Sequence, residues 1–525
     1  MGNMLQLLKL SLVLGAHVCL GHPGCQSEKV IKCLTASDVP QALPGTQEFA
    51  ISSSVHNLRQ QFTPLAIALP TTVSHVQAAV ACGRKHGVKV NARSGGHSYA
   101  SHGIGGEDGH LVIDLRFLNE VVVDPDTNIA TIGPGTKLGN MAIALDAQGK
   151  RSIPQGICPK VGVGGHVLHG GWGYSTHNHG LFLDYLEEVQ GVTANSSVVT
   201  ASKTENPELF WALRGAGMSF VIATRFKFRT IPQPDEIQLF YMPFIWALSD
   251  AKAGWRIFQD YVASTARPKE MNIRVVIASA AVLGAEGSSI FLFEGAYHGS
   301  KADYETSIKP FRDAVMALGG YADVLNVPEV TSVGYLDSLL YANNNALLNL
   351  SPDPEPLESG IDDQLQLNGF YKSLVTDKLS DATVDPLMEA LTNSSQTNPN
   401  RNWLWITSAI GGPNSALSTM FPANSTSYSH RSSLFLWEFS DLVDNTATYP
   451  NDVGIPWVNQ FVDIVEREEG KQLGMYYNYA DPTIGDHEVA GRRYWPGNYD
   501  RLAELKRIWD ERGVFENPQT IGRSD

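Results

Sequence analysis

The residues with the clearest chemical potential lie in the segment 155–184, where glycines, histidines and one cysteine are concentrated. Glycines recur from Gly156 to Gly173, a spacing that suits a backbone lying against a flat polar ligand rather than a regular helix or strand. Cys158 has no second cysteine nearby, which excludes a local Cys-x-x-Cys metal or redox site. The residues alone predict a cofactor-facing loop. They leave Cys158 as a distant disulfide partner, a buried thiol, or a thiol bonded to something other than cysteine.

A second group of candidate residues follows the alternating segment 88–92, which predicts a strand. This segment runs directly into Arg93-Ser94-Gly95-Gly96-His97-Ser98. Two glycines after a strand allow successive backbone N–H groups to converge on an anion such as pyrophosphate. The segment matches neither GxGxxG nor GxxxxGK[ST], so the Rossmann and P-loop motifs are absent. By itself the glycine pair is equally consistent with a turn, and His97 with a structural hydrogen-bonding role.

Regular elements must position these two loops. Apolar periodicity and breaker residues predict helices at 72–87 and 138–148, and strands at 65–69, 111–115, 121–123, 129–132 and 220–228. Pro232 and Pro234 mark a domain seam. Beyond it, alternating strands at 272–278, 289–294, 403–410 and 434–439, with helical stretches between them, predict an antiparallel sheet with covering helices.

The C-terminal block contains the tyrosine-rich segment Tyr476-Tyr477-Asn478-Tyr479 and a predicted helix at 499–511. A row of tyrosines is usually packing. If the segment is a strand, its side chains alternate between two faces, so at least one phenol should face a cavity.

Composition and charge narrow the class of protein. The chain of 525 residues has 39 Lys and Arg against 54 Asp and Glu, a net charge of −15, and no basic run that could follow a phosphate backbone. Nucleic acid is therefore not an expected partner. No segment is long and apolar enough for a membrane span, so we expect no membrane association of that kind.

The N-terminus predicts export. Residues 1–21 resemble a signal peptide, with Lys9 before a short apolar run and small residues near position 21. Export agrees with four N-glycosylation sequons, at Asn195, Asn349, Asn393 and Asn424. We therefore expect a soluble protein that is secreted or lies in the lumen of the secretory pathway.

The segment 22–60 is predicted to be irregular, with Cys33 near the start of a short polar helix. Cys82 lies on the predicted helix 72–87. A disulfide between these two cysteines would tie the N-terminal segment to the first helix–strand unit, and an oxidising compartment permits it. The alternative is two free buried thiols.

Several motifs together resemble one family. Arg93-Ser-Gly-Gly-His97-Ser-Tyr99, Gly156-Ile-Cys158-Pro-Lys-Val-Gly-Val-Gly-Gly-His166, Glu205-Asn-Pro-Glu-Leu-Phe-Trp211, Tyr477-Asn-Tyr479 and Phe515-Glu-Asn-Pro518 occur in the order found in berberine bridge enzyme-like FAD-linked oxidoreductases. The resemblance covers nearly the whole chain after the signal, and the closest pattern is that of glucooligosaccharide oxidase.

The resemblance implies an α+β, two-domain fold of the vanillyl-alcohol oxidase type. Its expected parts are a signal peptide (1–21), an N-terminal segment (22–60), the first part of the FAD-binding domain (61–234), a substrate domain with an antiparallel sheet (235–470), and a C-terminal berberine-bridge element (471–525). The last part would complete the FAD-binding domain.

The resemblance also implies FAD bonded covalently to both His97 and Cys158. Two bonds would fix the isoalloxazine ring and withdraw electron density from it, which should raise its redox potential. In this interpretation the partner of Cys158 is the flavin. The other expected cofactor-binding residues are Arg93, Ser94, Gly95, Gly96, Ser98, Gly162, Gly164, Gly165, His166, Gly170, Val221, Tyr477 and Asn478. His166, His169, His177 and His179 lie in a segment that this interpretation already assigns to FAD, so we expect no metal.

Catalytic roles follow from the same resemblance. Tyr479 is the expected base, with Tyr99 and Glu438 beside it. Since a phenol has a pKa of about 10, Tyr479 needs help near pH 7. Either Glu438 accepts the phenol proton, or a cation such as Arg274 lowers the phenol pKa. Val161, three residues after Cys158, is small enough to leave space for O2 beside the flavin.

Departures from the family pattern bear on the substrate. Val221 stands where the family usually has glycine, and Ile406, Ser408 and Val276 replace polar residues of the oligosaccharide oxidases. Glu438 replaces a sugar-binding glutamine, whereas Arg274 is retained. Because an unpaired hydroxyl against an apolar wall costs affinity, these changes argue against an oligosaccharide substrate.

The resulting prediction is a monomeric oxidase that transfers a hydride from an alcohol or amine carbon of a small organic substrate to FAD, with O2 as the acceptor. Alternatives are a ring-closing or desaturating oxidase of secondary metabolism, a carbohydrate oxidase, and a flavinylated protein without catalysis. Unreduced flavin in the presence of every donor tried would favour the last.

Overall fold

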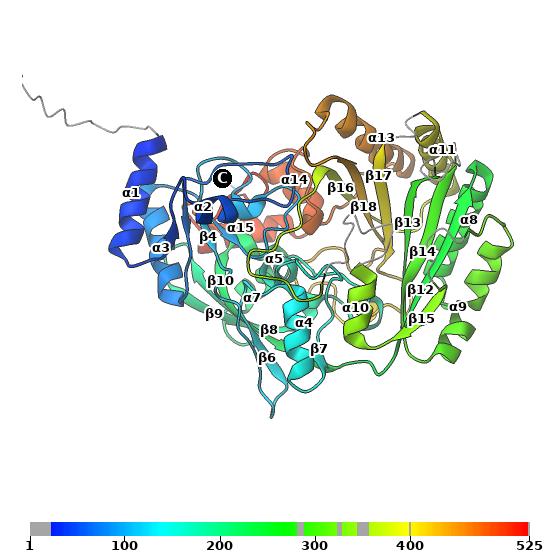
Figure 1. The fold of residues 1–525 in the computed structure, drawn as a ribbon, viewed down its shortest axis with the longest axis horizontal. Helices are drawn as coiled ribbons and strands as arrows, with labels where there is room; N and C mark the ends of the chain where they lie inside the picture. The colour runs from blue at the N-terminus through cyan, green and yellow to red at the C-terminus, as the bar shows by residue number, and fades with distance from the viewer. Residues whose placement is uncertain (1–22, 281–287, 323–327, 344–355, 398–400, 523–525) are drawn as a thin grey trace, which may run out of the picture.

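The structure is a computed structural model that describes residues 23–280, 288–322, 328–343, 356–397 and 401–522. The predicted signal peptide and the sequon at Asn349 lie outside these residues. The elements form two adjoining bodies (Figure 1). One carries the N-terminal half and the C-terminal helices, and the other is built on a large sheet.

The first body contains two main sheets. The four-stranded sheet has the order β1-β2-β4-β3, with β2 and β3 parallel to β4; the five-stranded antiparallel sheet has the order β5-β6-β10-β8-β9. The strands are β1 (Gln41–Ala42), β2 (Ala66–Ala68), β3 (Val90–Arg93), β4 (Leu111–Asp114), β5 (Val121–Val123), β6 (Ile129–Ile132), β8 (Leu186–Thr193), β9 (Val198–Ser202) and β10 (Val221–Arg229), with a small pair of β7 (Arg151–Ser152) and β11 (Ile231–Pro232).

Helices cover these sheets and complete the first body. They are α1 (Pro23–Ala36), α2 (Gln47–Ser52), α3 (Val73–His86), α4 (Leu138–Ala147), α5 (Val163–Leu168), α6 (Thr176–His179), α7 (Pro207–Ala216), α14 (His487–Tyr494) and α15 (Tyr499–Trp509). Short 3-10 turns are η1 (His102–Ile104), η2 (Phe182–Tyr185), η3 (Gly217–Ser219) and η5 (Tyr477–Tyr479).

The second body is a seven-stranded antiparallel sheet with the order β15-β12-β14-β13-β17-β18-β16. Helices α8, α9, α11 and α13 lie on its outer face, and α10 lies against α4 of the first body (Figure 1). The elements are β12 (Ile237–Trp246), α8 (Leu248–Ala263), β13 (Met271–Ser279), β14 (Ser289–His298), α9 (Lys301–Met316), β15 (Val330–Val333), α10 (Tyr335–Asn343), β16 (Asn368–Thr376), α11 (Asp381–Thr397), β17 (Asn402–Ala409), α12 (Ala416–Thr419), β18 (Phe435–Val443) and α13 (Asn451–Glu469).

The first helix–strand unit forms where the residues predict it. Thr72 caps α3 by accepting a hydrogen bond from the backbone N–H of His75, and Gly87 ends the helix with a left-handed φ of +64°. The buried face includes Val76, Ala79 and Val80. Strand β3 follows and delivers Arg93 to the start of the first glycine-rich loop.

Two predictions about the N-terminal segment are wrong. Residues 22–60 are not irregular, since α1 and α2 form there, and Cys33 lies near the end of α1 rather than near the start of a helix. The weakly apolar α1 forms because Val30 and Leu34 pack into the core beside α3. A disulfide joins Cys33 to Cys82 across a separation of 49 residues, so these cysteines form the bridge considered above and not two free thiols.

The segment 155–184 is not one continuous loop, because it contains α5 and α6. Helix α5 tolerates its glycines because Val163 and Val167 are buried and anchor it. The tyrosine-rich segment is a 3-10 turn, not a strand. Among the helices of the described residues, none is long and apolar enough to cross a bilayer.

Candidate active site

A cavity of about 360 Å³ lies between the first body and the seven-stranded sheet. Both glycine-rich loops, η5 and strands β13, β17 and β18 contribute to its wall. The predicted site residues that line it are Ser94, Gly95, Gly96, His97, Ser98, Tyr99, Cys158, Val161, Gly162, Gly164, Gly165, His166, Val221, Arg274, Glu438, Tyr477, Asn478 and Tyr479.

The two glycine-rich loops pack directly against each other. A Cβ on Gly95 would lie 2.4 Å from the backbone nitrogen of Gly162, and a Cβ on Gly162 would lie 2.1 Å from that of Gly95. Ser94 links the loops further: its hydroxyl donates to the carbonyl of Pro134 (2.6 Å) and accepts from the N–H of Gly164 (3.3 Å). These contacts explain why side chains are excluded at the glycines, and they bring the two halves of the site together.

His97 is half-buried in the cavity wall. Its Nε2 has no hydrogen-bond partner among the described residues, and its ring stacks on that of His56 with centroids 4.2 Å apart. Burial lowers the pKa of His97 well below its ordinary value, with smaller contributions from His56 and from nearby cations. The imidazole is therefore neutral near pH 7, which is the form that acts as a nucleophile.

Cys158 is half-buried, stays outside the disulfide and lines the same cavity. The loop that carries it is held at Gly156, whose N–H donates to Nε2 of His166 (3.0 Å). Because that nitrogen accepts, the His166 ring is neutral, and partial burial lowers its pKa to about 3. His166 thus has a structural contact in addition to its place in the wall.

The remaining histidines of this segment have separate environments. His169 lines the cavity and donates to the carbonyl of Gly165 (2.9 Å), whereas His177 donates to the carbonyl of Lys269 (2.9 Å) in the second body. Within the described parts of the chain, no three His, Cys, Asp or Glu side chains are grouped as metal ligands would be.

Two of the predicted cofactor residues do not line the cavity. The guanidinium of Arg93 turns away and pairs with the buried Asp114 (2.9 Å), because that carboxylate needs a cation. Gly170 has a φ of +141° and lies against the ring of Tyr476, so it shapes the chain behind the wall. Both residues support the site from behind.

In the wall of the same cavity, Glu438 lies beside Tyr99 and Tyr479. The hydroxyl of Tyr99 donates to Oε1 of Glu438 (2.6 Å), and the ring of Tyr99 lies 5.7 Å from that of Tyr479. Burial raises the pKa of Tyr479 well above its ordinary value, and the Glu438 carboxylate raises it further. Burial also raises the pKa of Glu438.

Arg274 lies on strand β13, which β17 separates from β18. It donates to Oε1 of Glu294 at 2.7 Å through Nε, and its guanidinium lies 4.9 Å from the ring centroid of Tyr174. Its charge is therefore largely compensated by a buried carboxylate. Although Arg274 acts to lower the pKa of Tyr479, the net direction is upward.

The part of the wall that β17 and β18 form includes the apolar side chains of Leu404, Ile406 and Leu442. Ile406 lines the cavity, but Ser408 and Val276 are buried and do not. Sequence reasoning missed other wall residues: Leu365 and Leu367 before β16, Tyr371 on β16, Leu404 and Leu442 on β17 and β18, and His56 beside His97. No local pattern marked them, because each reaches the wall only through the packing of distant segments.

The residues present fit FAD. The backbone at Gly165 lines the cavity, and a Cβ there would meet no described atom within 4 Å, so a flat ligand can approach it. His97, whose Nε2 has no hydrogen-bond partner among the described residues, and Cys158 both line the same space. The glycine-rich loops supply backbone N–H groups of the kind that bind pyrophosphate.

Similarity to known protein families and relatives also indicates FAD binding. A family model described as an FAD binding domain matches residues 64–202, and one described as berberine and berberine like matches residues 475–522. The fold and the site therefore define an FAD-linked oxidoreductase. The xylooligosaccharide oxidase of Thermothelomyces thermophilus is 37% identical over 509 residues, covering 95% of each chain. The chain belongs to the berberine bridge enzyme-like FAD-linked oxidoreductases, which confirms the predicted family, fold class and enzyme class.

Solved structures give the same result. The xylooligosaccharide oxidase from Myceliophthora thermophila C1 in complex with xylobiose has a TM-score of 0.85 at 36% identity, covering 95% of this chain and 100% of that one. A structure of glucooligosaccharide oxidase from Acremonium strictum, described with 6-S-cysteinyl, 8α-N1-histidyl FAD, has a TM-score of 0.85 at 32% identity, covering 94% and 99%.

Proposed function

We propose that this protein is a secreted oxidase that holds FAD through covalent bonds to His97 and Cys158 and oxidises a small organic alcohol or amine. One observation carries the proposal: His97 and Cys158 line the same cavity as the Tyr99–Glu438–Tyr479 cluster. FAD, when bound, accepts a hydride from the substrate carbon and passes the electrons to O2, giving H2O2.

Tyr479 and Glu438 would remove the substrate proton together. Because the pKa of Tyr479 is raised, a free phenolate is disfavoured, and the phenol acts better as a relay. It accepts the hydroxyl or amine proton of the substrate while its own proton passes to Glu438. Tyr99 holds Glu438 in place through its hydrogen bond. Of the two ways to assist Tyr479, this geometry favours Glu438 over Arg274.

The substrate would have an apolar body. Leu404, Ile406 and Leu442 face the cavity from β17 and β18, where a sugar would need hydrogen-bonding groups. The relatives named above are oligosaccharide oxidases, so a carbohydrate is the second candidate. Arg274, Ser440 and Glu438 would be the polar contacts available to it. A ring-closing or desaturating oxidase would use the same apolar wall.

A substrate screen decides between these classes. Purified protein is mixed without oxygen with apolar alcohols, amines and xylo-, gluco- and chitooligosaccharides, and the loss of flavin absorbance is recorded. Air is then admitted and H2O2 is measured. Reduction by apolar donors, with little by oligosaccharides, supports the proposal. Reduction by oligosaccharides alone would contradict it, and flavin that no donor reduces would favour a binding protein without catalysis.

The pH profile tests the role of Glu438. Burial raises the pKa of this carboxyl, so the acid limb of kcat/KM should lie above the ordinary range of a glutamate, with activity rising as the carboxylate ionises. Glu438→Gln should lose this limb and about 10²-fold or more in kcat. Ser440→Ala, a change to a cavity residue on the same strand, serves as the control. A Gln variant that keeps the wild-type profile would exclude Glu438.

The reaction with oxygen tests Val161. This half-buried side chain lines the cavity, and a larger one should close the space next to FAD. Val161→Leu is expected to slow reoxidation by about tenfold, which needs only about 1.4 kcal/mol of barrier. Reduction by substrate, measured without oxygen in the same variant, is the internal control. Reoxidation at the wild-type rate would remove Val161 from this role.

The proposal also covers the secretion, the glycosylation and the oligomeric state of the protein. The disulfide and the exposed side chains of Asn195, Asn393 and Asn424 are compatible with an oxidising, glycosylating compartment. We keep the predicted domain boundaries, with the insertion at 235–470 and completion of the FAD-binding domain by 471–525. We also propose that the protein acts as a monomer.

A further inference from the structure

Residues 356–367, which we call the strap, connect to the second body but lie on the first (Figure 1, yellow-green). Near its start, Ser359 and Asn140 exchange hydrogen bonds of 2.9 and 3.0 Å, and Lys137 donates to the carbonyl of Gly360 (2.7 Å). Near its end, the N–H of Leu367 donates to the carbonyl of His56 (2.8 Å). The strap is thus fixed at both ends to the FAD-binding body.

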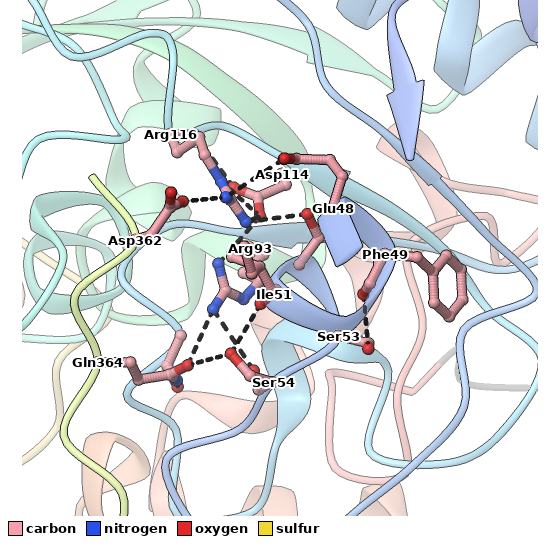
Figure 2. Close-up of polar contacts among 12 residues, drawn as sticks. Glu48, Phe49, Ile51, Ser53, Ser54, Arg93, Asp114, Arg116, Asp362 and Gln364 are labelled. Carbon is pink, nitrogen blue, oxygen red and sulfur yellow. Dashed lines mark hydrogen bonds and ion pairs between the residues drawn. The ribbon is translucent and has the colours of Figure 1, made fainter. Parts of the chain in front are cut away.

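Between these ends, the side chain of Gln364 holds the first glycine-rich loop. Its Nε2 donates to the carbonyl of Gly96 (2.9 Å), and its Oε1 accepts from the hydroxyl of Ser54 (2.5 Å) and from Nη2 of Arg93 (3.2 Å). Figure 2 shows Gln364 directed at both Ser54 and Arg93, with Asp114 on the far side of Arg93. Both the amide nitrogen and the carbonyl oxygen of the Gln364 side chain therefore form hydrogen bonds.

The hydrogen bond from Gln364 is made at Gly96, a position where the backbone conformation requires glycine. Gly96 has a left-handed φ of +70°, and a Cβ there would meet Nη2 of Arg93 at 2.7 Å and Nε2 of Gln364 at 2.8 Å. His97 is the next residue, so the orientation of the Gly96 peptide sets the direction of the imidazole.

The strap also acts on the His97 ring, through the ring of His56 that stacks on it. Nδ1 of His56 donates to the carbonyl of Leu365 (2.7 Å), and the His56 ring stacks on His97. Gln364 thus fixes the Gly96 peptide that precedes His97. Its neighbour Leu365 fixes the His56 ring that packs on His97. An imidazole without a hydrogen-bond partner at Nε2 depends on such contacts for its orientation.

We propose that Gln364 is a positioning residue that orients His97 for its bond to FAD; this inference rests on the proposed function. Bond formation breaks a methyl C–H and the imidazole N–H and makes one C–N bond. The two protons and two electrons released would pass to the flavin ring, and O2 would remove them as H2O2. Such a step is slow when the nucleophile is misplaced by even about 1 Å, which can cost about 10²-fold in rate.

The test compares two glutamines of the strap. Gln364→Met removes the hydrogen bond to Gly96 and those from Ser54 and Arg93, whereas Gln366→Met removes one amide donor from the carbonyl of Val55 (3.1 Å), outside the first glycine-rich loop. Each full-length variant is digested, and mass spectrometry measures the share of the His97 peptide that carries flavin. We expect this share to fall about tenfold in Gln364→Met and to stay near wild type in Gln366→Met. Flavin on Cys158 should persist in both.

Thermal unfolding of both variants separates positioning from general stability. If Gln364→Met does not fold, Gln364→Glu decides, because it keeps the acceptor for Ser54 and Arg93 but loses the donor to Gly96. A wild-type share of His97 flavin in a folded Gln364 variant would overturn the inference. A wild-type protein without flavin on His97 would instead refute the proposed function.

Discussion

Replacement of Tyr479 by phenylalanine is expected to slow reduction of bound FAD by substrate by about 10² to 10⁴-fold. The substitution keeps the ring, which packs near Tyr99 and Tyr476, and deletes only the hydroxyl that relays the substrate proton to Glu438. Rapid mixing without oxygen measures the reduction step itself, so a change in reoxidation cannot disguise the effect.

Tyr371 offers a matched control. It lines the same cavity, stacks on Tyr99 with centroids 3.9 Å apart, and its hydroxyl has no hydrogen-bond partner among the described residues. Tyr371→Phe should therefore reduce within a fewfold of wild type. If Tyr479→Phe behaves in the same way, Tyr479 does not take the proton, which must then leave to Glu438 or to water.

The second large effect concerns retention of the cofactor. His97→Ala and Cys158→Ala should each keep FAD after acid denaturation, because the remaining bond still holds it. The double variant should release all of its FAD into the acid supernatant or bind none during purification. Flavin fluorescence of supernatant and pellet gives the measurement.

The single variants are the controls for the double variant. If only one single variant releases its flavin, the tether residue that remains in that variant forms no bond to FAD. Retention by the double variant would mean that a third residue holds the cofactor, and the tethers would have to be reassigned.

Elements with local signals were predictable from the sequence. The Thr72 cap and the Gly87 stop define α3 within a single segment, and the alternation over 220–228 predicts β10. Strand β12 lacked such a signal because Pro243 interrupts it. The ladder with β15 ends at Phe240, and next to the proline the chain meets only an isolated bridge, where the N–H of Ala322 donates to the Pro243 carbonyl (3.0 Å).

The site was predictable where motifs carry it. His97, Cys158, Tyr479 and Glu438 all line one cavity, although they come from distant parts of the chain. What the sequence could not supply are contacts that arise only on folding. Gln364 contacts Gly96 across a separation of 268 residues, and no sequence pattern in either segment predicts that contact. Arg93 was assigned to the cofactor because a local motif cannot show that its guanidinium turns toward Asp114.

The central claim is that one cavity presents both His97 and Cys158 to the same FAD. Proteolysis of the purified wild-type protein followed by mass spectrometry tests it most directly. We expect a single flavin-bearing species in which the peptides containing His97 and Cys158 are joined through FAD. Unmodified peptides for both residues, with free FAD recovered from the denatured protein, would contradict it.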